Sequence, residues 1–211
     1  MNAELADGLL RLILLVVSIG LHEFGHAWVA DLRGDPLPRA QGRVSLNPFV
    51  HADPIGTIAI PAVMIFLSPG VGLIGWGRPV QVALLNPRTR RIDDLLITLA
   101  GPGMNLLLCA VFALVGGLGG FDKGTTAHFL AQGVLLNAAL IAFNLLPVPP
   151  LDGSRVALRL GLFSEQAFMS LSRWGFVILL VLVNLPPFRA VLGTVLGLLA
   201  TPWFALWDAL L

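Results

Sequence analysis

The sequence predicts an all-α polytopic membrane protein, and three observations support this. Of its 211 residues, 56% are hydrophobic and only 12% are charged, whereas soluble domains carry about 25% charged residues. The apolar residues gather in runs long enough for bilayer-spanning helices, which need about 20 residues. These runs lack the polar–apolar alternation of membrane barrel strands. A soluble enzyme, a nucleic-acid-binding protein and a disordered chain are therefore excluded, and the formal net charge of +1 indicates no polyanionic partner.

Five runs are candidate spans, and they predict one integral membrane domain over residues 1–211. In chain order they are Leu9–Ala30, Leu95–Leu118, His128–Pro147, Leu171–Leu185 and Phe188–Leu210. The first is not a signal peptide, because it is too long, contains ionisable residues and precedes no small-residue cleavage site. Pro186-Pro187 cannot continue a helix and predicts a turn between the last two runs. We expect a core of three helices over about residues 9–160 and about two C-terminal helices over residues 171–210.

The segment Ile55–Trp76 is also apolar, but Pro61 and Ser68-Pro69-Gly70 interrupt it. If it crosses the bilayer, eight cations face one side and four the other, with Arg189 left over. If it enters and returns, ten of the 13 Lys and Arg residues share one side and three lie opposite. The second arrangement fits the positive-inside rule better. We therefore interpret Ile55–Trp76 as a hairpin or re-entrant element and expect the N-terminus outside the cytoplasm.

The first span contains the pattern His22-Glu23-Phe24-Gly25-His26. Histidines at positions i and i+4 share one helix face, so both imidazoles can reach one metal ion. The glutamate beside the first histidine can then deprotonate a metal-bound water. Ionisable residues within a span cost about 2.5–3.5 kcal/mol on insertion scales, which favours a functional role. The structural alternative is that both histidines are hydrogen-bonded at a helix end.

A catalytic zinc ion usually has three protein ligands, so a third should exist. The candidates near the membrane are Asp152, His51, His128, Asp53, Asp93 and Asp94. Asp152 is favoured because three prolines within Pro147–Pro150 release backbone carbonyls, and such backbone at membrane depth lines a cavity or is buried in protein. The alternative is that Asp152 caps a helix over Ser154–Leu162. The two remaining histidines are more typical of structural or loop positions.

The middle span contains Gly101-Pro102-Gly103-Met104-Asn105. Small residues allow helices to approach closely, and Asn105 brings a hydrogen-bonding side chain to that contact. Taken alone, this pattern indicates helix packing rather than catalysis.

Together these patterns resemble the site-2 protease family of intramembrane zinc metalloproteases. Members carry a His-Glu-x-x-His motif on one core helix, Gly-Pro-x-x-Asn on the next, and Asn, Pro and Leu-Asp-Gly on the third. The corresponding residues here are His22–His26, Gly101–Asn105, and Asn144, Pro147 and Leu151–Gly153. The stretch Leu46–Gly56 also resembles a segment of small bacterial members. The resemblance covers about residues 9–160.

The resemblance implies a three-helix catalytic core and a zinc ion held by His22, His26 and Asp152, with Glu23 as general base. Asn144 and Asn105 are the candidate substrate-binding residues. The implied activity is that of a zinc endopeptidase cleaving peptide bonds within or near transmembrane helices of membrane proteins, as in regulated intramembrane proteolysis. We expect a multi-pass protein of the bacterial plasma membrane, with its active site nearer the cytoplasmic side.

The partners expected from this function are membrane protein substrates, the lipid bilayer and no nucleic acid. The loop Gly119–Ala127 is too short for the PDZ or CBS domain of larger relatives, so substrate selection would need a regulatory membrane partner. A substrate helix must unwind before cleavage. Arg43–Asn47 and Pro79–Ala83 could each be an ordinary loop or offer a strand edge to the unwound chain.

Three alternatives remain open at this point. A metal transporter would place ionisable residues along a path through related halves, whereas here they concentrate at one point without an evident repeat. A catalytically silent scaffold would not need the full set of ligands and base. A structural zinc site would favour four ligands and no adjacent glutamate.

Overall fold

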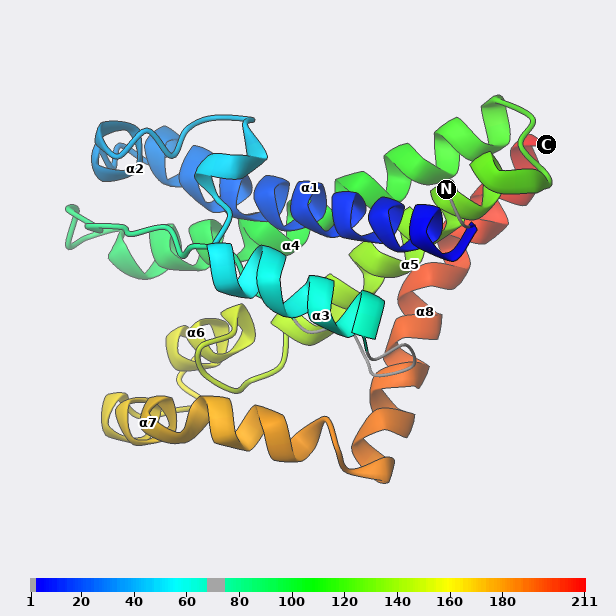
Figure 1. The fold of residues 1–211 in the computed structure, drawn as a ribbon. Helices are drawn as coiled ribbons and strands as arrows, with labels where there is room; N and C mark the ends of the chain where they lie inside the picture. The colour runs from blue at the N-terminus through cyan, green and yellow to red at the C-terminus, as the bar shows by residue number, and fades with distance from the viewer. Residues whose placement is uncertain (1–2, 68–74) are drawn as a thin grey trace. The chain divides into compact units, whose positions relative to one another are not determined.

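The computed structural model describes residues 3–67 and 75–211, and within these ranges the secondary structure is helical (Figure 1). The chain divides into two compact units, Met1–Leu85 and Asn86–Leu211. Unit 1 contains α1 (Ala3–Leu32), α2 (Leu37–Ala40), the 3-10 turn η1 (Pro48–Val50), the π-helix η2 (Pro54–Ala59) and α3 (Ile60–Leu67). Unit 2 contains α4 (Arg90–Leu118), α5 (Gly124–Asn144), α6 (Asp152–Arg159), α7 (Glu165–Leu182) and α8 (Pro186–Leu210).

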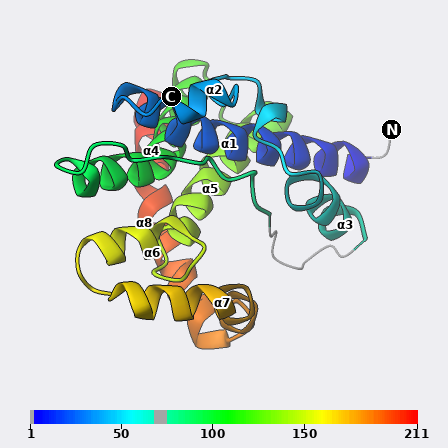
Figure 2. The ribbon, with the colours of Figure 1, turned by 90° about the vertical axis from the view of Figure 1, so that its left-hand side faces the viewer.

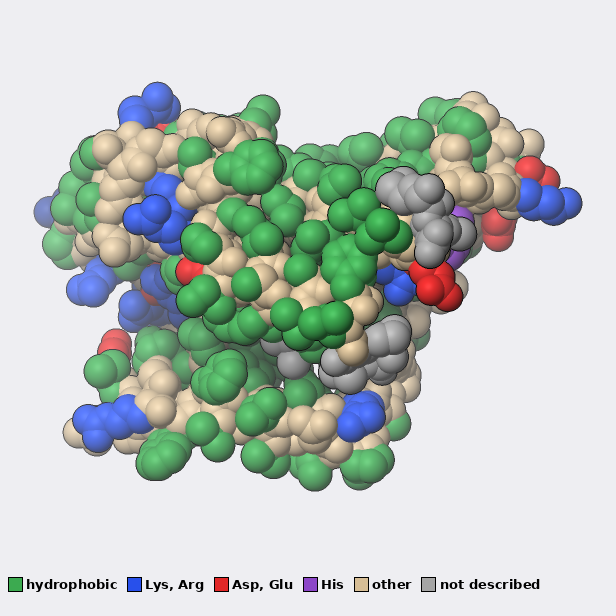
Figure 3. Space-filling model, viewed as in Figure 1, with side chains coloured by type: hydrophobic (Ala, Val, Ile, Leu, Met, Phe, Trp, Pro, Cys, Tyr) green, Lys and Arg blue, Asp and Glu red, His purple; other side chains and the backbone are tan. Residues whose placement is uncertain are grey.

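Five helices in the described ranges are long and apolar enough to cross a membrane, namely α1, α4, α5, α7 and α8. They correspond to the five predicted spans, so the prediction of an all-α polytopic membrane protein is confirmed. The surface agrees with this class. Over α1 and α3 many of the side chains on the face seen in Figure 3 are hydrophobic. Exposed apolar side chains on these two helices include Ile13, Val63 and Leu67. Such a surface is suited to lipid rather than water.

The segment after η1 forms a hairpin, as the sequence predicts. Its apolar helix, Pro54–Leu67, is shorter than a span. The backbone N–H of Trp76 donates to the Gly56 carbonyl over 3.2 Å, and the Thr57 hydroxyl donates to the Trp76 carbonyl over 2.7 Å. Ala52 and Gly77 form an isolated antiparallel bridge. Both ends of the segment therefore lie side by side, as expected of a hairpin. The predicted interruption at Ser68-Pro69-Gly70 lies outside the described residues.

Within unit 1 the hairpin packs along α1 (Figure 2). A Cβ atom added to Gly8 would lie 3.0 Å from the Ile65 side chain, and one added to Gly20 would lie 2.7–2.8 Å from Pro48. Small residues on α1 therefore let both α3 and η1 approach its backbone, as is common between membrane helices.

Unit 2 is built on the packing of α4, α5 and α8. Cys109, Ala113, Val134 and Ala138 are fully buried between the helices. The indole of Trp207 on α8 packs against Gly116 of α4, and its N–H donates to the Phe121 carbonyl over 3.2 Å. Because these contacts join well-separated parts of the chain, they fix the three helices to one another.

Beyond α5 the chain is irregular until Asp152, where α6 begins. Leu151, with φ −71° and ψ 155°, is the N-cap, so the alternative prediction of an Asp152 cap before a Ser154–Leu162 helix is wrong. The extended backbone of Leu151 lets the helix start two residues earlier, and a carboxylate in the first turn favours the helix dipole. The predicted break before Pro186 is confirmed, because α7 ends at Leu182 and α8 begins at Pro186.

Candidate metal centre

His22 and His26 form the centre of the candidate site, one helical turn apart on α1. Their Nε2 atoms lie 3.1 Å apart, and the two rings meet edge to face at 83° with centroids 4.7 Å apart. Two ligands at about 2.0–2.1 Å from a tetrahedral zinc ion are about 3.3–3.4 Å apart. The two nitrogens are therefore spaced for one ion. Both side chains are buried, at 6% and 9% exposure, so their shared face is largely shielded from solvent.

Glu23, between the histidines, lies against the returning end of the hairpin. A Cβ atom added to Gly77 would lie 2.8 Å from Glu23 Cγ and 3.0 Å from its Oε1. The backbone at Gly77 thus passes directly over the glutamate side chain. The absence of a side chain at position 77 makes room for Glu23 beside the histidine pair.

Arg43 is a buried cation in the same unit, although the sequence suggested a loop position. Its side chain is 5% exposed, and its guanidinium donates to the Val50 carbonyl over 2.6 Å and to the Arg78 carbonyl. Burial lowers the pKa of Arg43, while the nearby charge of Glu23 opposes that shift. Arg43 therefore ties together the two ends of the hairpin beside Glu23.

Asp35 anchors the extended chain that follows the hairpin. Its carboxylate accepts hydrogen bonds from the backbone N–H groups of Leu37 over 3.0 Å, Ala83 over 2.5 Å and Leu84 over 3.1 Å. Between Val80 and Leu85 the side chains alternate between half-buried and exposed, which is the pattern of an extended segment. Neither this segment nor Arg43–Asn47 is assigned as a strand in the described ranges. Strand addition by a substrate stays a prediction.

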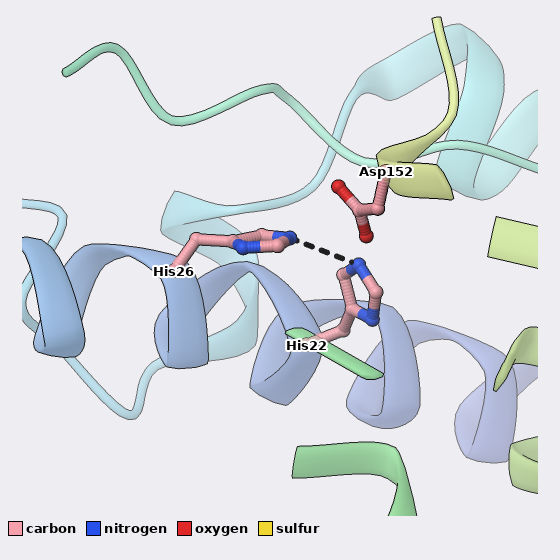
Figure 4. Close-up of side chains that lie close together, drawn as sticks. All are labelled: His22, His26 and Asp152. Atoms are coloured by element: carbon pink, nitrogen blue, oxygen red, sulfur yellow. Dashed lines mark hydrogen bonds between the residues drawn. The ribbon is translucent and has the colours of Figure 1, made fainter. Parts of the chain in front are cut away.

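Asp152 is the first residue of α6 in unit 2, and its side chain is half-buried. Figure 4 draws it with His22 and His26, and each of the three offers one ligand atom. Two imidazole nitrogens and one carboxylate oxygen form a donor set that catalytic zinc accepts, with a fourth position open to water. The chemistry of these three residues therefore fits a zinc ion.

The other ligand candidates have different partners. His51 is fully buried, and its Nε2 is 2.9 Å from the Ser45 carbonyl. His128 is exposed and is hydrogen-bonded to Gln132. Among the carboxylates, Asp53 is the N-cap of η2 and Asp93 accepts a hydrogen bond from the Thr89 hydroxyl. Asp94 is paired with two arginines.

The two candidate substrate-binding asparagines lie at different depths in unit 2. Asn105 is fully buried and donates to Asn137 Oδ1 over 2.8 Å, which joins α4 to α5. This is the helix-packing contact that its small neighbours predict. Asn144 is half-buried in the last turn of α5, and its amide donates to the Leu140 carbonyl over 3.0 Å. A substrate role for either stays a prediction.

A His-Glu-x-x-His pair within an apolar span is the pattern expected of a membrane metalloprotease, and comparison with known proteins identifies the family. The chain is 38% identical over 184 residues to YwhC of Bacillus subtilis, which is named as a candidate zinc metalloprotease; the match covers 82% of this chain and 80% of YwhC. It is 32% identical to the Rip2 proteins of Mycolicibacterium smegmatis and Mycobacterium tuberculosis, which carry the same description, over 81% of this chain and 65% of theirs. The chain belongs to the site-2 protease family of zinc metalloproteases. No family model and no solved structure matches it.

Proposed function

We propose that this protein is an intramembrane zinc endopeptidase that cleaves membrane proteins within or near their transmembrane helices. The observation that carries the proposal is the His22–His26 pair, whose Nε2 atoms are 3.1 Å apart inside an apolar helix, with Glu23 between them. Ionisable residues inside a membrane-spanning helix cost free energy of insertion, so their presence there favours a functional role such as metal binding. The membership of the chain in a family of zinc metalloproteases supports the same function.

The proposed zinc ligands are His22, His26 and Asp152. Asp152 belongs to the Leu-Asp-Gly motif that corresponds to the third core helix of the family, and it is not the cap of α6. When bound, zinc supplies a Lewis acid that polarises the scissile carbonyl and lowers the pKa of a water molecule towards about 7.

Glu23 is the proposed general base. Its carboxylate accepts a proton from the attacking water as the water oxygen bonds to the carbonyl carbon. The same proton is then delivered to the amide nitrogen as the C–N bond breaks. The Gly77 backbone limits the space around the Glu23 side chain, so this group is held close to the histidine pair during both transfers.

We further propose that the protein lies in the plasma membrane with its active site nearer the cytoplasmic side. A hairpin that returns to its starting side of the membrane puts ten of the 13 Lys and Arg residues on one face, and the bridge between Ala52 and Gly77 supports such a hairpin. His26 lies six residues before the end of α1 at Leu32, which is about 9 Å along a helix. The site is therefore close to the face that the positive-inside rule assigns to the cytoplasm. The proposed substrates are membrane proteins with a transmembrane helix, selected with the help of a regulatory membrane partner.

The first test is the zinc content of detergent-purified protein, compared among the wild type, Asp152→Ala and Glu23→Gln. We expect about one zinc per chain in the wild type, loss of zinc in Asp152→Ala and retention in Glu23→Gln. Undiminished zinc in Asp152→Ala would show that the third ligand lies elsewhere.

The second test is cleavage of a membrane reporter in proteoliposomes. Glu23→Gln should cleave at background rate while keeping its zinc, and normal cleavage by this variant would refute the role of Glu23. Zinc flux into liposomes without reporter cleavage would instead identify a metal transporter.

A further inference from the structure

Asp94 is the most deeply buried carboxylate among the described ion pairs, and it holds two arginines. Its side chain is 1% exposed. Oδ1 accepts from Arg155 Nη2 over 2.9 Å, and Oδ2 accepts from Arg159 Nε over 2.5 Å. Asp94 lies on α4 and both arginines lie on α6. One carboxylate therefore anchors the middle and the C-terminal end of this short helix.

The two arginines share a helix face with the proposed ligand Asp152. Positions 152, 155 and 159 are separated by three and four residues, and residues with these spacings are neighbours on a helix surface. Another part of α6 is fixed by Gly153, where an added Cβ atom would lie 2.6 Å from the Leu146 carbonyl oxygen. Asp94 and this backbone contact together set the rotation of α6 about its axis, and hence the direction of its first side chain.

The charges on this face have a second consequence. Asp152 and Arg155 are an i, i+3 pair of opposite charge, which on a helix attract one another. In the structure Arg155 is held by Asp94. If Asp94 were neutral, Arg155, whose side chain is 36% exposed, would lose its anionic partner and be able to turn to another carboxylate. The nearest replacement on its own helix is the Asp152 carboxylate, and an arginine bound there would compete with a metal cation.

We propose that Asp94 is a positioning residue for the zinc ligand Asp152, because it fixes the rotation of α6 and keeps Arg155 away from the ligand carboxylate. This inference rests on the proposed function, in which Asp152 binds zinc. It assigns Asp94 a role behind the ligand rather than at the metal. Partners that orient a metal ligand typically change metal affinity by about 10–100-fold when they are removed.

The test measures the zinc dissociation constant of the purified full chain by competition with a chelating indicator. Asp94→Asn should bind zinc at least about tenfold more weakly than the wild type. Adding Arg155→Gln to Asp94→Asn removes the competing cation and should restore the part of the affinity that is lost through competition by Arg155. A purely structural role of Asp94 would not give this rescue, because the double variant lacks even more of the ion pair.

Asp93→Asn is the matched control. Asp93 is adjacent, is also buried at 5% exposure and accepts a hydrogen bond from the hydroxyl of Thr89, the N-cap residue of its own helix. The zinc affinity of Asp93→Asn should stay within about twofold of that of the wild type. Arg155→Gln alone should also bind zinc normally, which provides a second measurement if Asp94→Asn does not fold.

The outcomes separate this inference from the function on which it rests. If the wild type binds no zinc, the proposed function fails. If the wild type binds zinc and Asp94→Asn binds it equally well, only the role of Asp94 is refuted. A double variant as weak as Asp94→Asn, or a tenfold loss in Arg155→Gln alone, would equally overturn the proposal.

Discussion

Replacing Gly77 with alanine tests the contact between the hairpin and the proposed general base. The new Cβ atom would lie 2.8 Å from Glu23 Cγ and 2.8 Å from Ile19 Cγ2, whereas ordinary contact begins at 3.4 Å. The glutamate side chain or the hairpin backbone must therefore move by about 0.6 Å. Because Gly77 is buried and is held by the neighbouring Ala52 bridge, the glutamate is the more movable partner.

The expected effect is on catalysis more than on binding or stability. A displacement of about 1 Å at a catalytic group can reduce the rate about 100-fold, so a shift of about 0.6 Å should lower kcat by about 10–100-fold. Zinc content and KM should change little, since the atoms nearest to the new methyl group belong to Glu23 and Ile19 and not to the histidines. Overpacking of this size costs about 1–3 kcal/mol of folding free energy.

The assay is cleavage of a membrane reporter in proteoliposomes, with zinc content measured on the same preparation. Gly193→Ala is the matched control, because a Cβ atom at that position on α8 meets nothing within 4 Å. It should retain wild-type activity. If Gly77→Ala cleaves as fast as Gly193→Ala, then Glu23 does not lie under the hairpin backbone during the reaction, and the reasoning fails.

Two further predictions concern stability, measured by thermal unfolding in detergent. Asn105→Ala removes the donor to Asn137 Oδ1 and should destabilise unit 2 by about 0.6–1.7 kcal/mol, the range for hydrogen bonds between membrane helices; an unchanged unfolding temperature would contradict this contact. Burial lowers the pKa of His51, and the nearby charge of Arg43 lowers it further, against the opposing hydrogen bond to the Ser45 carbonyl. The unfolded chain therefore binds a proton at His51 more readily than the folded chain does. The contribution of the neutral His51 to the free energy of unfolding is complete above pH about 6.5 and is lost as the pH falls below that value. In His51→Gln the loss of stability between pH about 7 and about 5 should be smaller than in the wild type, and an identical pH dependence would refute the assignment.

Periodic and compositional patterns predicted most of the helical architecture. The five apolar runs correspond to α1, α4, α5, α7 and α8, because a span must satisfy its backbone internally and the bilayer fixes its length. The His22–His26 spacing likewise predicted a shared helix face, since the helical repeat is local. The hairpin was predicted from charge asymmetry together with the interruption at Pro61, and the Ala52–Gly77 bridge confirms it.

Helix boundaries were harder to predict where charged residues are buried. The second span was expected to begin at Leu95, but α4 begins at Arg90 and includes Asp93 and Asp94. The sequence presented these carboxylates only as candidate metal ligands near the membrane, and they are tolerated inside because Thr89 and two arginines of α6 bind them. A distant partner of this kind leaves no local signal.

The surroundings of Glu23 were also outside the reach of local patterns. Arg43 was counted as a loop cation, yet it is buried and bound to carbonyl groups up to 35 residues away. Asp35 holds an extended segment 48–49 residues further along the chain. Both contacts depend on how the hairpin folds back, so they could not be inferred from spacing alone.

The packing of Trp207 against Gly116 has a consequence for biogenesis. These residues are far apart in the chain, and membrane helices are inserted as they are synthesised. While α4 and α5 emerge, the glycine surface on α4 lacks its tryptophan, and the Phe121 carbonyl lacks the indole donor that binds it in the finished protein. Unit 2 therefore cannot complete its assembly until α8 has entered the bilayer. Substitutions at this late contact should reduce the yield of mature protein, because incompletely packed intermediates are exposed to misassembly and degradation.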